Sequence, residues 1–248
     1  MSPRTVLNVG LLAGLLGAAG AAEAQVSRVF VSVNGNDANN CASQATPCRT
    51  INGGITQVDA EGEVIILDSG SYAGGAITKA VKVNAAPGVV VFSGLSFTIN
   101  PGAGKTVVLR GITIKAVTPG SGAGIQHSTG NLMLENCVID GWLTGINVQT
   151  PGNLSINNTI FRNNTNGGGD GFGVNVQNGT ASLTNSHLAN NSTGIRLLGG
   201  VLTVSNSVIV QNGTGILRSA GTLVSMLNNV VEGNTTNTSG TITSGTLK

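Results

Sequence analysis

A repeat of 21 residues in the second half of the chain limits the possible folds more than any other feature of the sequence. A glycine followed by an aliphatic residue marks each unit, and the steps between these glycines are 21, 28, 21 and 21 residues. The markers are Gly124, Gly145, Gly173, Gly194 and Gly215. The longer step contains the insertion Asn166-Gly-Gly-Gly-Asp170. A short repeat of fixed period indicates a solenoid, in which each unit packs only against its neighbours.

An asparagine recurs in phase with the glycine. A hydrophobic residue stands two positions before each asparagine, and another stands three positions after it. Each unit therefore reads as three short strands separated by turns, as in residues 145–148, 154–156 and 159–162. The recurring asparagines are Asn136, Asn158, Asn185, Asn206 and Asn228.

This pattern predicts an all-β fold, a single-stranded parallel β-helix of about eight or nine coils. Stacked coils bury one side chain of each alternating pair in aliphatic columns. We expect the asparagines to bond from coil to coil as a ladder, and the marker glycines to supply tight turns with positive φ. Cys137 falls in a row of mostly small inward residues, so we expect it in the core.

The two ends of the chain predict a simple domain organisation. Arg4, the apolar stretch 6–22 and Ala22-Glu23-Ala24 indicate a signal peptide over residues 1–24, with an uncleaved anchor helix as the alternative. Residues 25–60 are expected to hold an N-terminal strand, a disulfide loop and a short capping helix at 50–58. Residues 61–240 should form the β-helix, and residues 241–248 a C-terminal tail.

Two cysteines, Cys41 and Cys48, bracket a short polar loop. In an exported protein they predict a disulfide that closes this loop. A metal site is the alternative, but it needs more ligands than the neighbouring sequence offers.

Composition limits the classes of partner that we expect this protein to bind. Charged residues make up 9% of the chain, the formal net charge is +2, and lysine and arginine do not cluster. This balance argues against nucleic acid or an anionic membrane as a partner. No segment after the first two dozen residues is long and apolar enough to span a bilayer, so we expect no membrane span after signal cleavage.

Several N-terminal segments resemble those of a known group. Residues 29–37 (VFVSVNGND), 47–51 (PCRTI), 62–68 (GEVIILD) and 70–72 (GSY) are similar to the opening of secreted right-handed parallel β-helix proteins. The repeat resembles that of the pectin-lyase-like superfamily. The resemblance implies a right-handed helix, a structural Tyr72, and a substrate cleft beside the sheet formed by the glycine-led strands. It does not imply one activity, because the superfamily holds lyases, hydrolases, epimerases and adhesins.

The residues that catalysis requires in those relatives are sparse here. Pectate lyases hold Ca²⁺ with clustered carboxylates, and polygalacturonase-like relatives need three aspartates and a histidine. From Gly124 onward the carboxylates are Glu135, Asp140, Asp170 and Glu232, with no Asp-Asp or Asp-x-Asp pair. His127 and His187 fall in different registers. We therefore predict no catalytic set, no metal site and no cofactor.

A polar surface remains as the candidate ligand-binding site. Outward positions of the glycine-led strands carry amide and arginine side chains, which can hydrogen-bond sugar hydroxyls. Two aromatic residues in the preceding turns suggest a platform for a sugar ring. The alternatives are an ordinary solvated surface, and a Trp142 that packs beneath the long loop. The candidate residues are Asn147, Gln149, Asn175, Gln177, Arg196, Asp140, Trp142, Asp170 and Phe172.

These patterns predict a secreted protein, extracellular or periplasmic, that is non-catalytic and binds polysaccharide or a cell-surface glycan. One alternative is a polysaccharide lyase or glycoside hydrolase with a reduced active site. Another is an adhesin-like fragment without a defined ligand.

Overall fold

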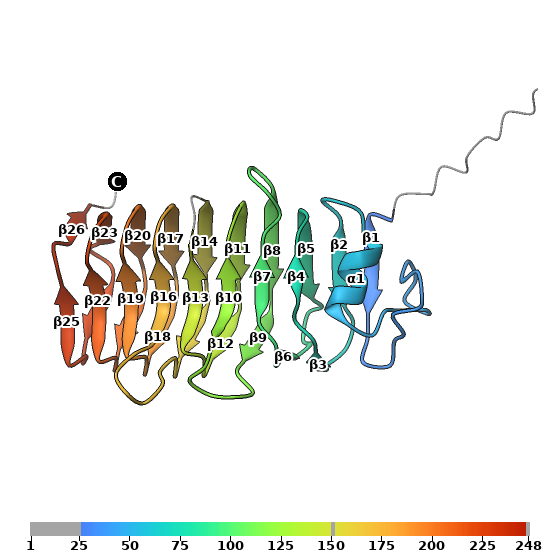
Figure 1. The fold of residues 1–248 in the computed structure, drawn as a ribbon, viewed down its shortest axis with the longest axis horizontal. Helices are drawn as coiled ribbons and strands as arrows, with labels where there is room; N and C mark the ends of the chain where they lie inside the picture. The colour runs from blue at the N-terminus through green and yellow to red at the C-terminus, as the bar shows by residue number, and fades with distance from the viewer. Residues whose placement is uncertain (1–25, 150–151, 247–248) are drawn as a thin grey trace, which may run out of the picture.

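The computed structural model describes residues 26–149 and 152–246, which form three parallel sheets along one long axis (Figure 1). The predicted signal peptide, and the anchor helix that is its alternative, lie outside the described residues. The chain passes from sheet A to sheet B to sheet C in each coil, and the next coil adds one strand to each sheet.

Sheet A has ten strands. They are β1 (Arg28–Val31), β2 (Glu63–Ile66), β5 (Val81–Ala85), β8 (Thr106–Arg110), β11 (Asn131–Glu135), β14 (Asn153–Asn157), β17 (Thr180–Thr184), β20 (Val201–Ser205), β23 (Thr222–Met226) and β26 (Thr243–Gly245).

Sheets B and C have eight strands each. Sheet B contains β3 (Gly70–Tyr72), β6 (Val91–Ser93), β9 (Ile112–Lys115), β12 (Val138–Asp140), β15 (Ile160–Arg162), β18 (His187–Ala189), β21 (Val208–Val210) and β24 (Val230–Glu232). Sheet C contains β4 (Ala76–Ile77), β7 (Phe97–Ile99), β10 (Ala123–His127), β13 (Thr144–Val148), β16 (Phe172–Val176), β19 (Thr193–Leu197), β22 (Thr214–Arg218) and β25 (Thr236–Ser239).

The register of the sheets confirms the predicted repeat. The aliphatic residue after each marker glycine pairs with its equivalent one coil away, and all five of these residues are fully buried. They are Ile125, Ile146, Val174, Ile195 and Ile216. The fold is therefore the parallel β-helix that the sequence predicts, with eight strands in two of its sheets.

A short helix covers the N-terminal end, as predicted. Helix α1 (Ile51–Gln57) starts at Thr50, whose hydroxyl accepts a hydrogen bond from Gly53 N. Ile51, Ile55 and the C-cap residue Val58 are buried against the first coils. Figure 1 shows α1 beside β1 and β2, so the first strands of the stack are shielded on this side.

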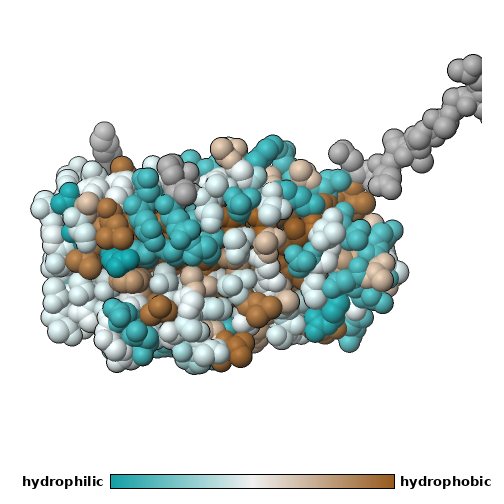
Figure 2. Space-filling view, viewed as in Figure 1, coloured by the Kyte–Doolittle hydropathy of each residue, from teal (hydrophilic) through white to brown (hydrophobic). Residues whose placement is uncertain are grey.

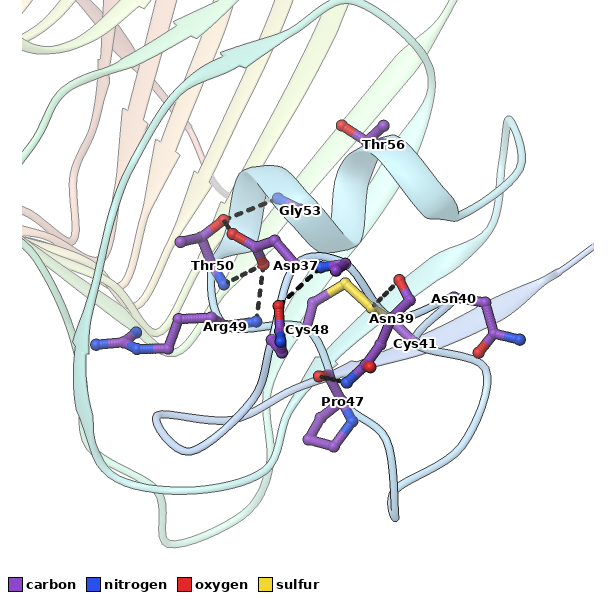
Figure 3. The surroundings of a disulfide bond; sticks show 12 residues. Asp37, Asn39, Asn40, Cys41, Pro47, Cys48, Arg49, Thr50, Gly53 and Thr56 are labelled. Atoms are coloured by element: carbon purple, nitrogen blue, oxygen red, sulfur yellow. Dashed lines mark hydrogen bonds between the residues drawn. A yellow bond between two sulfur atoms is a disulfide. The ribbon is translucent and has the colours of Figure 1, made fainter.

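The predicted disulfide between Cys41 and Cys48 is present, with a Cα–Cα distance of 5.2 Å. Figure 3 shows that Asp37, which precedes the loop closed by the disulfide, points at the start of the helix. Asp37 Oδ1 accepts hydrogen bonds from the backbone N–H groups of Arg49 and Thr50 at 2.8 and 2.9 Å. The loop and the helix therefore form one N-terminal cap.

The C-terminal end differs from the prediction. Residues 241–248 were expected to be a tail, but β26 within them pairs with β23 in sheet A. The β-helix therefore continues past residue 240.

The row of corner asparagines between sheets A and B is only partly a ladder. Asn136, Asn158, Asn185 and Asn206 all have positive φ, which asparagine tolerates better than most residues. Asn158 bonds to Asn136 and Asn206 bonds to Asn185, but Asn185 donates to Asn157 instead of Asn158. Asn228 accepts from the backbone of Asn206. All five are exposed, so the backbone turn explains their recurrence better than side-chain bonding does.

A second asparagine row, not predicted, forms a buried ladder between sheets B and C. Asn164, Asn191 and Asn212 are 0%, 3% and 3% exposed. The Nδ2 of Asn164 donates to Asn191 Oδ1 at 2.8 Å, and Asn191 donates in turn to Asn212 Oδ1 at 2.9 Å. Each Oδ1 also accepts the backbone N–H of the preceding asparagine. The ladder thereby satisfies backbone groups that the turn would otherwise bury unpaired.

The marker glycines make room for this ladder, and the prediction that they supply positive-φ turns is wrong. A Cβ at Gly194 would lie 2.7 Å from Gly215 O and 3.2 Å from the Asn212 amide nitrogen, and Gly194 does not have positive φ. Glycine is therefore required because the neighbouring coil and its asparagine approach too closely for a side chain.

Cys137 is buried in a row of small side chains, as predicted. Thr159, Ser186 and Ser207 follow it one coil apart and are 1–3% exposed. Burial raises the pKa of the Cys137 thiol to about 11, so the thiol stays protonated at neutral pH.

We predict that Asn191→Ala lowers the free energy of unfolding by about 3 kcal/mol, because it leaves several buried N–H and C=O groups without partners. Urea unfolding followed by circular dichroism measures this. The control is Asn153→Ala, which removes one exposed hydrogen bond to Asn131 and should cost less than about 1 kcal/mol. Equal effects of the two substitutions would contradict a structural role for the buried ladder.

Candidate functional site

The predicted polar row lies on the outer side of sheet C. Gln126, Asn147, Asn175 and Arg196 occupy equivalent positions in β10, β13, β16 and β19. We call these four residues the amide row. Figure 2 shows hydrophilic side chains gathered over these strands.

The side chains of the amide row bond to one another. Asn147 Nδ2 donates to Gln126 Oε1 at 3.2 Å, and Asn175 Nδ2 donates to Asn147 Oδ1 at 2.8 Å. Gln177 Nε2 also donates to Asn147 Oδ1, at 3.0 Å. The row is therefore held in one conformation, and part of its hydrogen-bonding capacity is already used. Gln149 is exposed at the edge of the row.

Arg196 is the best-positioned group for a ligand. Its Nε donates to Asn175 Oδ1 at 2.9 Å, and its guanidinium carbon lies 3.8 Å from the centre of the Phe172 ring. Burial lowers the pKa of Arg196, while the charge of Asp170 raises it. Arginine stays charged at neutral pH, so the site holds a fixed cation beside an exposed carboxylate.

The predicted aromatic platform of Trp142 and Phe172 is wrong. Trp142 is 8% exposed, and its Nε1 donates to Ile114 O at 3.1 Å. Its backbone N–H donates to Asn164 Oδ1, so Trp142 occupies the position that an asparagine holds in the later coils. Phe172 is half-buried and stacks against Arg196. Packing beneath the loops, the alternative interpretation of Trp142, agrees with its burial.

Asp140 does not join this site. It lies on sheet B, is 5% exposed, and forms an ion pair of 3.1 Å with Arg162 Nη2. Its other oxygen accepts a hydrogen bond from Asn163 Nδ2 at 2.9 Å. Both carboxylate oxygens are already bonded, so Asp140 stabilises a corner of the coil instead of facing a ligand.

Two loops lead into the N-terminal ends of strands in sheet C. They connect β9 to β10 and β15 to β16, and Figure 1 shows both projecting from the body of the helix. The second contains Asp170, whose carbonyl accepts hydrogen bonds from Asn166 N and Ser192 Oγ. The insertion in the repeat is thus a closed loop beside Phe172 and Arg196.

Another hollow lies along the outer side of sheet A. Three adjoining hollows of about 510, 330 and 380 Å³ share lining residues, and we call them together the sheet-A trough. Lys82 and Lys105 line one end, and Asn131, Asn153 and Thr180 line the other. No repeat in the sequence indicates this trough, because one of its walls is the non-repetitive loop between β7 and β8.

The two histidines are apart, as predicted. His187 is exposed on sheet B. His127 is 1% exposed at the end of β10, where its Nε2 lies 3.0 Å from Gly130 O. Its Nδ1 is buried and has no hydrogen-bond partner among the described residues. Desolvation lowers the pKa of His127.

The donor groups do not fit a metal such as the Ca²⁺ of pectate lyases. Within residues 26–149 and 152–246, no three His, Cys, Asp or Glu side chains are grouped so that they could hold a metal ion. Asp170 has Arg196 as its charged neighbour and Asp140 is bonded to Arg162. Across the same residues, no helix is long and apolar enough to cross a membrane.

Comparison with known proteins agrees with this architecture. Residues 84–201 match the family described as "Right handed beta helix region". The crystal structure of pectate lyase Pel9A is similar with a TM-score of 0.69 and 16% sequence identity, over 88% of this chain and 67% of that chain. No curated protein matches the chain at a significant level.

The protein therefore has a right-handed parallel β-helix fold, the fold that pectate lyase Pel9A also has. At 16% identity the likeness to the pectate lyase concerns the fold alone, and activity has to be argued from the site.

We predict that the free energy of unfolding falls as the pH drops below about 6.5. The pKa of His127 is lower in the folded protein than in the unfolded chain, so the unfolded chain binds a proton there first. His127→Leu should abolish this loss, and it also removes the unpaired Nδ1. Urea unfolding at several pH values between about 5 and 7.5 measures the effect. Asp68, whose pKa lies below 3.8, does not titrate in this window. An unchanged pH dependence in the variant would contradict the assignment.

Proposed function

We propose that this protein is an exported, non-catalytic β-helix that binds an extended glycan along the outer side of sheet C. The observation that carries the proposal is the fixed guanidinium of Arg196, held over Phe172 at 3.8 Å and tied to Asn175. Only its Nε is used in that hydrogen bond, so its two Nη groups are available to sugar hydroxyl or carboxylate oxygens.

The amide row supports an elongated ligand. Its members repeat once per coil, at the strand spacing of about 4.8 Å. Their mutual hydrogen bonds order the side chains before a ligand arrives, which lowers the entropy lost on binding. A chain of sugars lying parallel to the long axis would meet Gln126, Asn147 and Arg196 in turn. Asn175 is 4% exposed and holds Asn147 and Arg196 in place.

Binding without catalysis is favoured by the state of the carboxylates. Glycoside hydrolysis generally uses a pair of carboxyl groups on either side of the scissile bond. Asp170 stands near Arg196, whereas Asp140 is buried in an ion pair on another sheet. Asp140 therefore cannot act as the second carboxyl group that hydrolysis at Asp170 would require.

A second candidate function is polysaccharide cleavage by a lyase. The similarity to pectate lyase Pel9A favours it, as does the lowered pKa of Arg196. A lyase needs a base to remove a proton next to a carboxylate, and Arg196 is the group that would have to act.

Export is part of the proposal. The disulfide between Cys41 and Cys48 is the kind of bond that persists in oxidising compartments. The sequence of residues 1–24 has the composition of a signal peptide.

We predict that Arg196→Ala weakens glycan binding at least about tenfold, because it removes a charge-assisted contact and frees the Phe172 ring. A glycan array identifies ligands, and isothermal titration measures the affinity of the best of them. The matched control is Lys82→Ala in the sheet-A trough, which removes one positive charge far from sheet C.

Loss of binding in Lys82→Ala with full binding in Arg196→Ala would place the ligand in the trough and contradict the proposed face. The same polysaccharides are incubated with the protein, with and without Ca²⁺, while unsaturated products and new reducing ends are followed. Turnover that disappears in Arg196→Ala would replace the binding function with the lyase.

A further inference from the structure

The outer side of sheet B carries an apolar row where a solvated sheet would carry polar residues. Six equivalent outward positions, from β9 to β24, hold one threonine, one histidine and four β-branched aliphatic residues. Val208 and Val230 are 38% and 41% exposed. The row is Thr113, Val138, Ile160, His187, Val208 and Val230.

A second outward row runs beside it, two residues further along each strand. It reads Lys115, Asp140, Arg162, Ala189, Val210 and Glu232. Asp140 and Arg162 neutralise each other in an ion pair. Lys115 and Glu232 are exposed at opposite ends of the row, and neither forms an ion pair within the described residues.

We propose that this face of sheet B binds a second copy of the chain in a two-fold dimer. The two-fold axis lies in the interface, parallel to the strands and midway between β15 and β18. This rotation places each row of one copy opposite the same row of the other copy, with the coils in the reverse order. Lys115 then faces Glu232 of the other copy, and Glu232 faces its Lys115, so both end charges gain partners.

The same operation matches the apolar row. Val138 meets Val208 of the second copy, Thr113 meets Val230, and Ile160 meets His187. Arg162 lies over the small Ala189, which leaves room for its side chain. The exposed asparagines of the A–B corner, such as Asn158 and Asn185, border the apolar row and supply the polar rim that interfaces usually have.

The described part of the chain leaves His187, Val208 and Val230 exposed, and Thr113, Val138 and Ile160 partly exposed. Its one helix, α1, packs against β1 and β2, at the far end of the molecule from most of the row (Figure 1). The face spans six strands, about 24 Å, by three residues, about 10 Å. This is smaller than a standard interface, so the dimer forms weakly and depends on concentration.

The register makes a charge-swap experiment decisive. Sedimentation equilibrium of the purified protein, from about 10 µM to about 1 mM, should show a mass rising toward twice that of the monomer. Lys115→Glu should weaken association roughly tenfold, since each of the two symmetric attractions becomes a repulsion. Glu232→Lys should do the same. The double variant Lys115→Glu, Glu232→Lys should restore the original association.

Controls separate this from general effects of charge or folding. Lys82→Glu makes the same charge change on sheet A and should leave association unchanged. Val208→Asp introduces a charge within the apolar row, opposite Val138 of the second copy, and should abolish association, with circular dichroism confirming the fold. A monomer at every concentration, or association that is insensitive to Lys115→Glu, would overturn the proposal. Failure of the double variant to restore association would overturn the two-fold arrangement.

Discussion

Parallel pairing in register between successive coils is the constraint on which the rest of this structure depends. Each residue of a strand lies beside the equivalent residue of the next coil, at about 4.8 Å. Any property that recurs with the repeat therefore becomes a continuous row in space. Aliphatic residues give dry columns such as the one from Ile125 to Ile216, and polar residues give hydrogen-bonded rows on the surface.

The same constraint explains why asparagine is used in two different ways. At the A–B corner it is exposed and tolerates positive φ, so its backbone conformation is what matters. At the B–C corner it is buried, and its side-chain amide both donates to and accepts from the next coil. The close approach of coils at the marker glycines makes room for this buried ladder. A buried ladder of hydrogen-bonded asparagines therefore lies beside the apolar core of the solenoid.

Much of the fold follows from the sequence because its main interactions repeat. The period, the inward residues, the cap helix and the disulfide are all local or periodic features, and the structure contains each of them. The buried ladder could also have been found, since Asn191 and Asn212 stand three residues before Gly194 and Gly215. Trp142 stands three residues before Gly145, which places it in the same buried row.

The candidate site on sheet C is harder to predict, because it depends on the rotamers of long side chains. Periodicity places Arg196 outward, but its contact with Phe172 depends on a rotamer and on the loop before β16. The sheet-A trough depends on a loop without repeats. The rows and their outward residues, Arg196 included, are therefore predictable, whereas the contact between Arg196 and Phe172 is not.

The central claim is the register itself, and disulfide trapping measures it most directly. Ser155 and Ser182 lie opposite each other in β14 and β17, on the outer side of sheet A. Their replacement by cysteine should give a spontaneous disulfide, because the Cα atoms of paired strands are within the range that a disulfide spans. The pair Ser155→Cys, Thr184→Cys, shifted by two residues, should stay reduced. Cross-linking of the shifted pair and not the matched pair would contradict the register and the rows derived from it.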